Sequence, residues 1–210
     1  MIDIAHEPQE ELVLGEYRYR LFLSFDNVLR VFDVWQDEDI EPRDRVFHAL
    51  YVLTRERDFY GLTIEQALAV YDMIHEEHIK VIRPTDAAPR YDLEGNVLPT
   101  KYDTDEDEDG DDSPPFSFKY DGDYIFASFM QAYGIDLIEQ QGKLSWRKFN
   151  ALLSGLPSDT KLAQVMEIRA WKPSDTIDKK ERERMRKLQK IYALPDERRK
   201  TQQDAEEEQE

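Results

Sequence analysis

The sequence predicts a mainly α-helical protein, with two small helical lobes joined by an acidic linker and followed by a projecting basic helix. Apolar residues recur at helical spacing on both sides of one central stretch. That stretch, residues 85–119, contains several prolines and many acidic residues and shows no periodic pattern. Hydrophobic residues make up 40% of the 210-residue chain and aromatic residues 11%, so a sizeable core can be buried.

The N-terminal lobe is predicted to span residues 1–84 and to begin with a short β-hairpin. β-prone runs flank Gly15-Glu16, which places this hairpin within residues 11–23. Asp26 is positioned to cap the helix that follows. The apolar stripe of that helix consists of Val28, Leu29, Phe32 and Trp35.

Two more helices are expected to complete this lobe. Pro42 suits the first position of the second helix. Thr63 and Gln66, three residues apart, predict a capping box at the start of the third helix. The apolar stripe of the third helix consists of Ile64, Ala67, Leu68, Tyr71 and Ile74.

The central stretch is predicted to be a mobile linker. From Thr85 to Pro115 there are 11 acidic and 2 basic residues, a net charge of −9 and thus half of the formal charge of −18. A segment this charged buries too little apolar surface to offset the entropy of ordering it.

The C-terminal lobe is predicted to span residues 120–173. Asp121 is positioned to cap its first helix, and Gly134 to end that helix in the left-handed conformation. Ser145 and Ser158 are expected to cap two shorter helices. This lobe therefore consists of three short helices.

A charged helix is expected over residues 174–195, ahead of a disordered acidic tail over residues 196–210. From Lys179 to Lys200 there are 10 basic and 4 acidic residues. A basic helix face of this kind is either solvated or docked on an acidic neighbouring subunit, so self-association is expected. The sparse apolar residues form a narrow stripe of Met185, Leu188, Ile191 and Tyr192.

Two stretches of the C-terminal lobe carry aromatic residues and glycines in a fixed order. The first is YDGDYIFASFMQAYGIDL, residues 120–137, and the second is GKLSWRKFNALLSGLP, residues 142–157. Together with the continuation to Arg169, they resemble the tail-assembly chaperones of long-tailed, siphovirus-type bacteriophages, which are small acidic proteins encoded beside the tape measure protein. That family has a histidine where this chain has Ser145, so no role of that histidine is carried over.

The resemblance implies a protein of the host bacterial cytoplasm that binds the tape measure protein, keeps it soluble and leaves during tail tube assembly. It implies no catalysis and no cofactor. A long amphipathic rod needs apolar grooves from its chaperone, and aromatic residues beyond a minimal core could line them. The candidate partner-binding residues are Phe126, Phe129, Tyr133, Trp146, Phe149, Met185, Leu188 and Tyr192. For the first five, core packing is the simplest interpretation and lining of a partner groove is the alternative.

Composition argues against several other classes of protein. The chain has no cysteine, which excludes disulfides, thiolate catalysis and cysteine zinc sites. No apolar run approaches the roughly 18 residues of a membrane span, and the first residues do not read as a signal peptide. The negative charge argues against affinity for nucleic acid or anionic membranes, although an acidic protein that mimics DNA and inhibits a host enzyme remains the alternative function.

Acidic and histidine clusters in the sequence resemble metal or catalytic sites only in part, and each has a plainer interpretation. The run Asp105–Gly110 matches half a calcium loop, but Phe116 stands where the bidentate glutamate belongs. His75 and His78 are three apart rather than the four of a metalloprotease helix, so they are read as cationic residues closing a helix. The carboxylates Asp123, Asp136 and Glu139 lack a surrounding pocket or nucleophile, and Asp136 is the expected ion-pair partner of Arg169.

Overall fold

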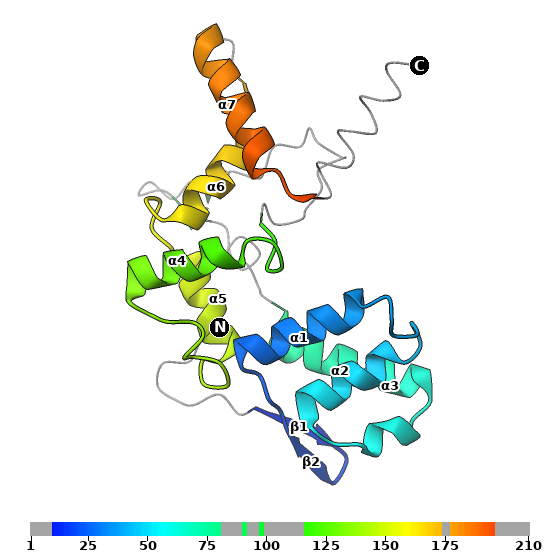
Figure 1. The fold of residues 1–210 in the computed structure, drawn as a ribbon. Coiled ribbons are helices and arrows are strands. Elements are labelled where there is room, and N and C mark those ends of the chain that lie inside the picture. Colours follow the sequence, from blue (N-terminus) through cyan, green and yellow to red (C-terminus); the bar gives the residue numbers. More distant parts are fainter. Residues whose placement is uncertain (1–9, 81–89, 92–96, 99–115, 174–176, 196–210) are drawn as a thin grey trace, which may run out of the picture. The chain divides into compact units, whose positions relative to one another are not determined.

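The computed structural model describes residues 10–80, 90–91, 97–98, 116–173 and 177–195 (Figure 1). In these residues the chain is mainly helical with a short N-terminal antiparallel hairpin, which confirms the predicted fold class. The α-helices are α1 (Phe25–Gln36), α2 (Arg45–Thr54), α3 (Ile64–Ile74), α4 (Gly122–Tyr133), α5 (Trp146–Ser154), α6 (Lys161–Ala170) and α7 (Lys179–Tyr192). The shorter elements are β1 (Glu11–Leu14), β2 (Tyr17–Arg20), the 3₁₀ helix η1 (Asp58–Gly61), the π-helical turn η2 (His75–Ile79), β3 (Arg90–Tyr91) and β4 (Val97–Leu98).

The chain divides into two compact units. Unit 1 comprises the described residues of Met1–Asp111 and of Gln140–Ala151, and unit 2 those of Asp112–Glu139 and Leu152–Glu210. The boundary within α5 differs from the prediction that residues 120–173 form one lobe. Of the predicted linker only residues 90–91, 97–98 and 116–119 are described, and the acidic tail and the calcium-like run lie outside the described residues.

The hairpin of unit 1 lies within the predicted range. β1 and β2 pair antiparallel with Leu12 opposite Tyr19, and Gly15 adopts a positive φ of 62° in the two-residue turn. Glycine takes this conformation without a steric penalty. The hairpin packs onto the helices because Leu12 is buried and the ring of Tyr19 lies 5.0 Å from that of Phe59 in η1.

Helices α1, α2 and α3 form the helical part of unit 1, with α2 packed on both of the others. The predicted capping box is confirmed, since Thr63 Oγ1 accepts from Gln66 N and Gln66 Oε1 accepts from Thr63 N. Two predicted helix starts are wrong by two and three residues. Ser24 is the N-cap of α1, so Asp26 lies in its first turn, and α2 begins at Arg45 instead of near Pro42.

Residues 140–151 belong to unit 1 because their backbone pairs with the start of α1. Phe25 N donates to Leu144 O at 2.9 Å, and Trp146 N donates to Leu23 O at 2.7 Å. The carboxylate of Asp26 accepts from Gly142 N at 2.8 Å, which uses the side chain that was expected to cap α1. These contacts join positions more than a hundred residues apart, so local sequence patterns could not reveal them.

Unit 2 is built on α6, which contacts both α4 and α7. Gly134 ends α4 with a φ of 64°, as predicted, and its N–H donates to Met130 O. Thr160 is the N-cap of α6, so the prediction that Ser158 takes this place is wrong. The hydroxyl of Ser128 accepts from Leu162 N at 2.9 Å, which joins α4 to the first turn of α6.

Candidate functional site

Two of the aromatic residues expected to bind a partner lie in the core of unit 1. Trp146 and Phe149 are buried, and the ring of Phe149 stacks on that of Phe25 at 4.9 Å. Trp146 Nε1 donates to Ile79 O at 2.7 Å, so the indole is satisfied inside the unit. These side chains hold α5 against α1 and η2, and they are not displayed at the surface.

The three aromatic residues expected on α4 differ in exposure. Phe129 is fully buried, whereas Phe126 and Tyr133 are partly exposed. Tyr133 Oη donates to Leu152 O at 2.8 Å, which ties the end of α4 to the last turn of α5. Phe126 and Tyr133 are therefore the two residues of this group that keep some exposed surface, and the hydroxyl of Tyr133 is already bound within the unit.

Three residues of the predicted apolar stripe of α7 face their own unit, whereas the fourth, Ile191, is 61% exposed. Met185, Leu188 and Tyr192 are partly buried and share the side that packs on α6. The hydroxyl of Tyr192 accepts from Lys161 Nζ at 2.8 Å, and this ammonium lies 4.6 Å from the centre of the same ring. These three side chains therefore pack α7 against α6.

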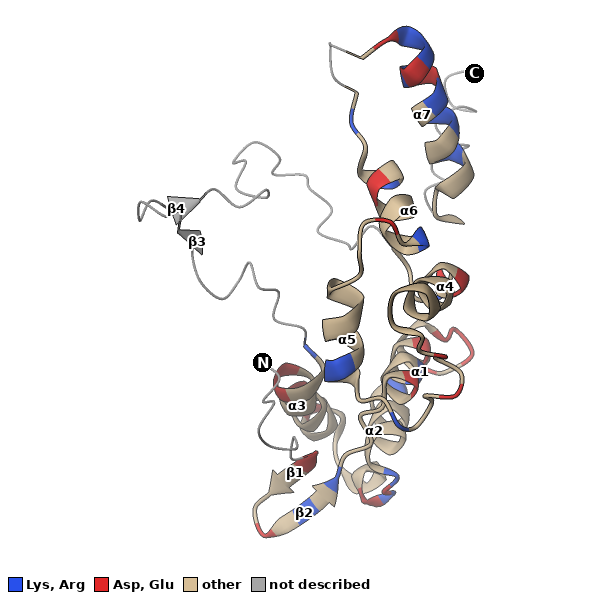
Figure 2. Cartoon of the chain, turned by 90° about the vertical axis from the view of Figure 1, so that its left-hand side faces the viewer, with Lys and Arg blue, Asp and Glu red and all other residues tan. Residues whose placement is uncertain are grey.

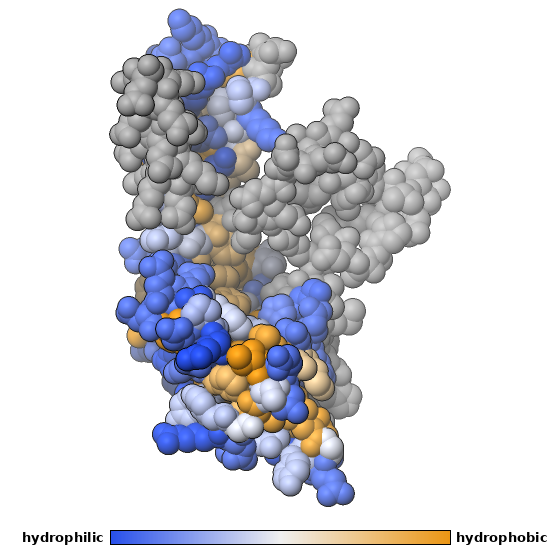
Figure 3. Space-filling view, turned by 90° about the vertical axis from the view of Figure 1, so that its right-hand side faces the viewer, coloured by the Kyte–Doolittle hydropathy of each residue, from blue (hydrophilic) through white to orange (hydrophobic). Residues whose placement is uncertain are grey.

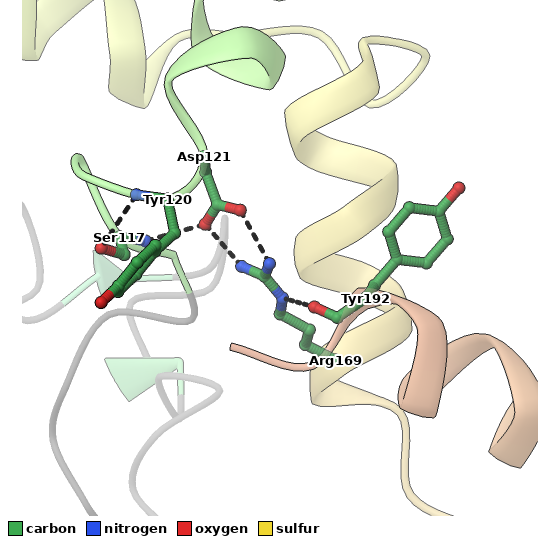
Figure 4. Close-up of polar contacts among 5 residues, drawn as sticks. All are labelled: Ser117, Tyr120, Asp121, Arg169 and Tyr192. Atoms are coloured by element: carbon green, nitrogen blue, oxygen red, sulfur yellow. Dashed lines mark hydrogen bonds and ion pairs between the residues drawn. The ribbon is translucent and has the colours of Figure 1, made fainter. Parts of the chain in front are cut away.

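A buried ion pair fixes the position at which α7 is seated (Figure 4). Arg169 on α6 donates through both terminal nitrogens to the two carboxylate oxygens of Asp121, at 2.6 and 2.7 Å. The side chains are only 8% and 2% exposed. Arg169 Nε donates to Tyr192 O at 2.7 Å, so one guanidinium joins α6, the start of α4 and the last residue of α7.

Asp121 replaces Asp136 as the partner of Arg169, so that prediction is wrong. Asp136 Oδ1 accepts from the backbone of Ile138 and Glu139 and stabilises a turn instead. Asp121 precedes α4 as predicted, but its side chain does not cap the helix. Its carboxylate accepts from Ser117 N at 2.8 Å in addition to Arg169.

The opposite side of α7 is exposed and basic (Figure 2). The residues on this side include six exposed cations, and Arg184 forms an ion pair with Glu181 at 3.0 Å. The other five form no ion pair in the part of the chain that the structure describes. We call these cations the basic face of α7: Lys179, Lys180, Arg184, Arg186, Lys187 and Lys190.

Unit 1 exposes apolar side chains that the sequence assigned to its core (Figure 3). Ile64 and Leu68 were expected in the buried stripe of α3, yet they are 40% and 38% exposed. They are four residues apart and therefore share one side of the helix. We call this pair the α3 patch. The predicted apolar stripe is broader than the surface of α3 that its neighbours cover, so these two side chains stay exposed.

A small aromatic cluster lies on α2 and η1 of the same unit. The ring of Tyr60 stacks on Phe47 at 5.8 Å and is 49% exposed. Tyr51, Arg57 and Tyr60 line an open pocket of about 250 Å³, with the guanidinium of Arg57 over the ring of Tyr51 at 6.0 Å. Such a pocket offers apolar and cation–π contacts to a side chain.

One of the two histidines, His78, differs in charge from the prediction. His78 is buried, and burial lowers the pKa of its imidazole below the ordinary value, which favours the neutral ring over the expected cation. Among the described residues no three His, Cys, Asp or Glu side chains are grouped as metal ligands. No helix in the described ranges is long and apolar enough to cross a membrane.

Comparison with known proteins yields one family. The sequence model of the family described as Bacteriophage Gp15 protein matches residues 9–194, which include both units and α7. Neither the curated proteins nor the solved structures gave a match.

Proposed function

Since this chain belongs to the bacteriophage Gp15 protein family, we propose that it is a tail-assembly chaperone that binds the tape measure protein and keeps it soluble. It acts by binding and not by catalysis, in the host bacterial cytoplasm, while the tail tube assembles. The signature in residues 120–157 supports this proposal through its resemblance to such chaperones.

The α3 patch is the observation that carries the proposal. Ile64 and Leu68 lie exposed on a helix whose other exposed residues include Glu65, Gln66 and Asp72. An amphipathic helix is bound through apolar anchors on one side and polar contacts at the rim. A tape measure protein, as a long amphipathic rod, supplies such helices repeatedly, so several chaperones can coat one rod.

Replacing the patch with charge tests this role in co-expression with the neighbouring tape measure protein. We expect wild type to bring the tape measure protein into the soluble fraction. The variant Ile64→Asp/Leu68→Asp should lower that soluble fraction at least about fivefold, because it removes two central apolar anchors. Both substitutions are at exposed positions, so the fold should persist, and circular dichroism checks this.

Met73→Asp is the matched control. Met73 is 50% exposed on the same helix but points to the side of α3 opposite Ile64. We expect this variant to keep the tape measure protein soluble. The chaperone proposal fails if the tape measure protein is equally insoluble with and without wild type, and the assignment to the patch fails if both variants behave alike.

A further inference from the structure

We propose that the basic face of α7 binds the acidic segment of residues 33–44 on a second copy of this chain. The inference concerns contacts between copies and does not depend on tape measure binding. It rests on two described surfaces of opposite charge that belong to different units.

The first surface is held rigidly for contact. The last turn of α7 is fixed by Arg169 Nε on Tyr192 O and by Gln189 Nε2, which donates to Trp171 O at 2.8 Å. The partly buried side of α7 is used in this seating, and the six cations of the basic face remain exposed on the other side. A fixed helix loses little conformational entropy on binding, which favours its use as a docking element.

The second surface is the end of α1 and the loop that leads to α2. Residues 33–44 contain six acidic residues and only one basic residue, Arg43. The rest of described unit 1 is balanced, with ten acidic and eleven basic residues, so the negative charge of this unit is concentrated at one place. The acidic residues are Asp33, Asp37, Glu38, Asp39, Glu41 and Asp44.

These surfaces match each other in net charge. The side of α7 that carries the basic face has six cations and Glu183, a net of +5, and residues 33–44 have a net of −5. Complementary charge of this kind steers association and fixes register. Each copy carries both surfaces, so one contact leaves a basic face and an acidic segment unused. These two surfaces either pair with each other in a closed dimer or bind further copies in rings or open chains.

Paired charge reversals in the full-length chain test the contact. Variant A is Lys180→Glu/Lys187→Glu on α7, and variant B is Glu38→Lys/Glu41→Lys in the acidic segment. The mass of each protein is followed against concentration by light scattering or sedimentation. We expect wild type to self-associate as its concentration rises, and variants A and B alone to associate at least about 30-fold more weakly.

Mixing the variants distinguishes contacts between copies from general charge effects. A keeps the acidic segment and B keeps the basic face, so an equimolar mixture should form a one-to-one pair with a single intact contact. A chain that carries all four changes has net charges of only +1 and −1 on the two surfaces, so it should associate as weakly as A or B. The control Lys119→Glu/Lys148→Glu has the charge change of A at exposed positions outside both surfaces and should assemble normally.

Several outcomes would overturn the proposal. A monomeric wild type at every concentration would mean that the basic face is solvated or bound within its own chain. A and B that remain monomeric when mixed would exclude this pair of surfaces, as would a control that loses assembly like A. Retention of a DNA duplex by wild type but not by A, without self-association, would assign the face to nucleic acid.

Discussion

Arg169 is the residue on which the seating of α7 depends most directly. Its guanidinium is nearly buried and serves three segments at once through Asp121 and Tyr192. An ion pair taken out of water contributes little net stability, because desolvation offsets most of the attraction. Removal of one partner is costly nevertheless, since the remaining charge stays buried without compensation.

We therefore expect Arg169→Met to lower the free energy of unfolding of unit 2 by about 3–5 kcal/mol. Methionine keeps the apolar stem, so lost packing is a small part of the effect. Hydrogen exchange of the backbone amides of α4 and α6, followed in urea, reports on this unit. The matched control is Asp123→Asn, an exposed carboxylate in the first turn of α4, two residues after Asp121, which should change stability by less than about 0.5 kcal/mol. Equal stability of Arg169→Met and wild type would show that the pair is dispensable.

At the scale of the helix, α4 begins at one glycine and is followed directly by another, and the two differ in the sign of φ. Gly134 ends the helix with a φ of 64°, whereas Gly122 begins it in a helical conformation without positive φ. An added methyl group meets no atom within 4 Å at either position, so only the backbone distinguishes them. This isolates the cost of a left-handed residue from any cost of crowding.

We expect Gly134→Ala to destabilise the protein by about 1 kcal/mol, because alanine is strained in the left-handed region. Gly122→Ala should be neutral or slightly stabilising, because alanine has the higher helix propensity. Thermal melts of the two variants beside wild type measure this difference. Equal melting temperatures for both would mean that Gly134 does not need its positive φ to end α4.

Local patterns predicted the helix boundaries far better than they predicted the partners of each helix. The capping box at Thr63 and the terminator at Gly134 depend on residues within one turn, and both are confirmed. The pairing of Arg169 with Asp121 spans 48 positions. The sequence predicted that Arg169 needs an acidic partner, but the choice of Asp136 was wrong, because no local pattern reports which carboxylate lies beside the guanidinium.

The candidate surfaces were predicted less well than the helices that carry them. Trp146 and Phe149 were candidates both for the core and for contact with a partner. Both are buried, as expected for large rings whose packing removes much apolar surface from water. The exposure of Ile64 and Leu68 depends on how much of α3 its neighbours cover. That quantity belongs to tertiary packing, so periodicity could not supply it.

For the whole molecule, charge and apolar surface are separated in a way that suits two different contacts. The α3 patch is apolar, while the basic face of α7 and residues 33–44 are strongly charged. Contacts between exposed charges are screened once the Debye length falls to a few ångströms, whereas burial of apolar surface is not weakened by salt. The same solution condition should therefore affect the two contacts differently.

We expect an increase from about 50 mM to about 500 mM sodium chloride to shift wild type from assemblies toward monomers. The proposed complex with the tape measure protein should survive the same change, because apolar anchors would dominate it. Sedimentation of this protein alone and pull-down of the tape measure protein at both salt concentrations measure the two effects separately. Release of the tape measure protein by salt, with unchanged self-association, would assign the charged surfaces to the partner and the apolar patch to the contact between copies.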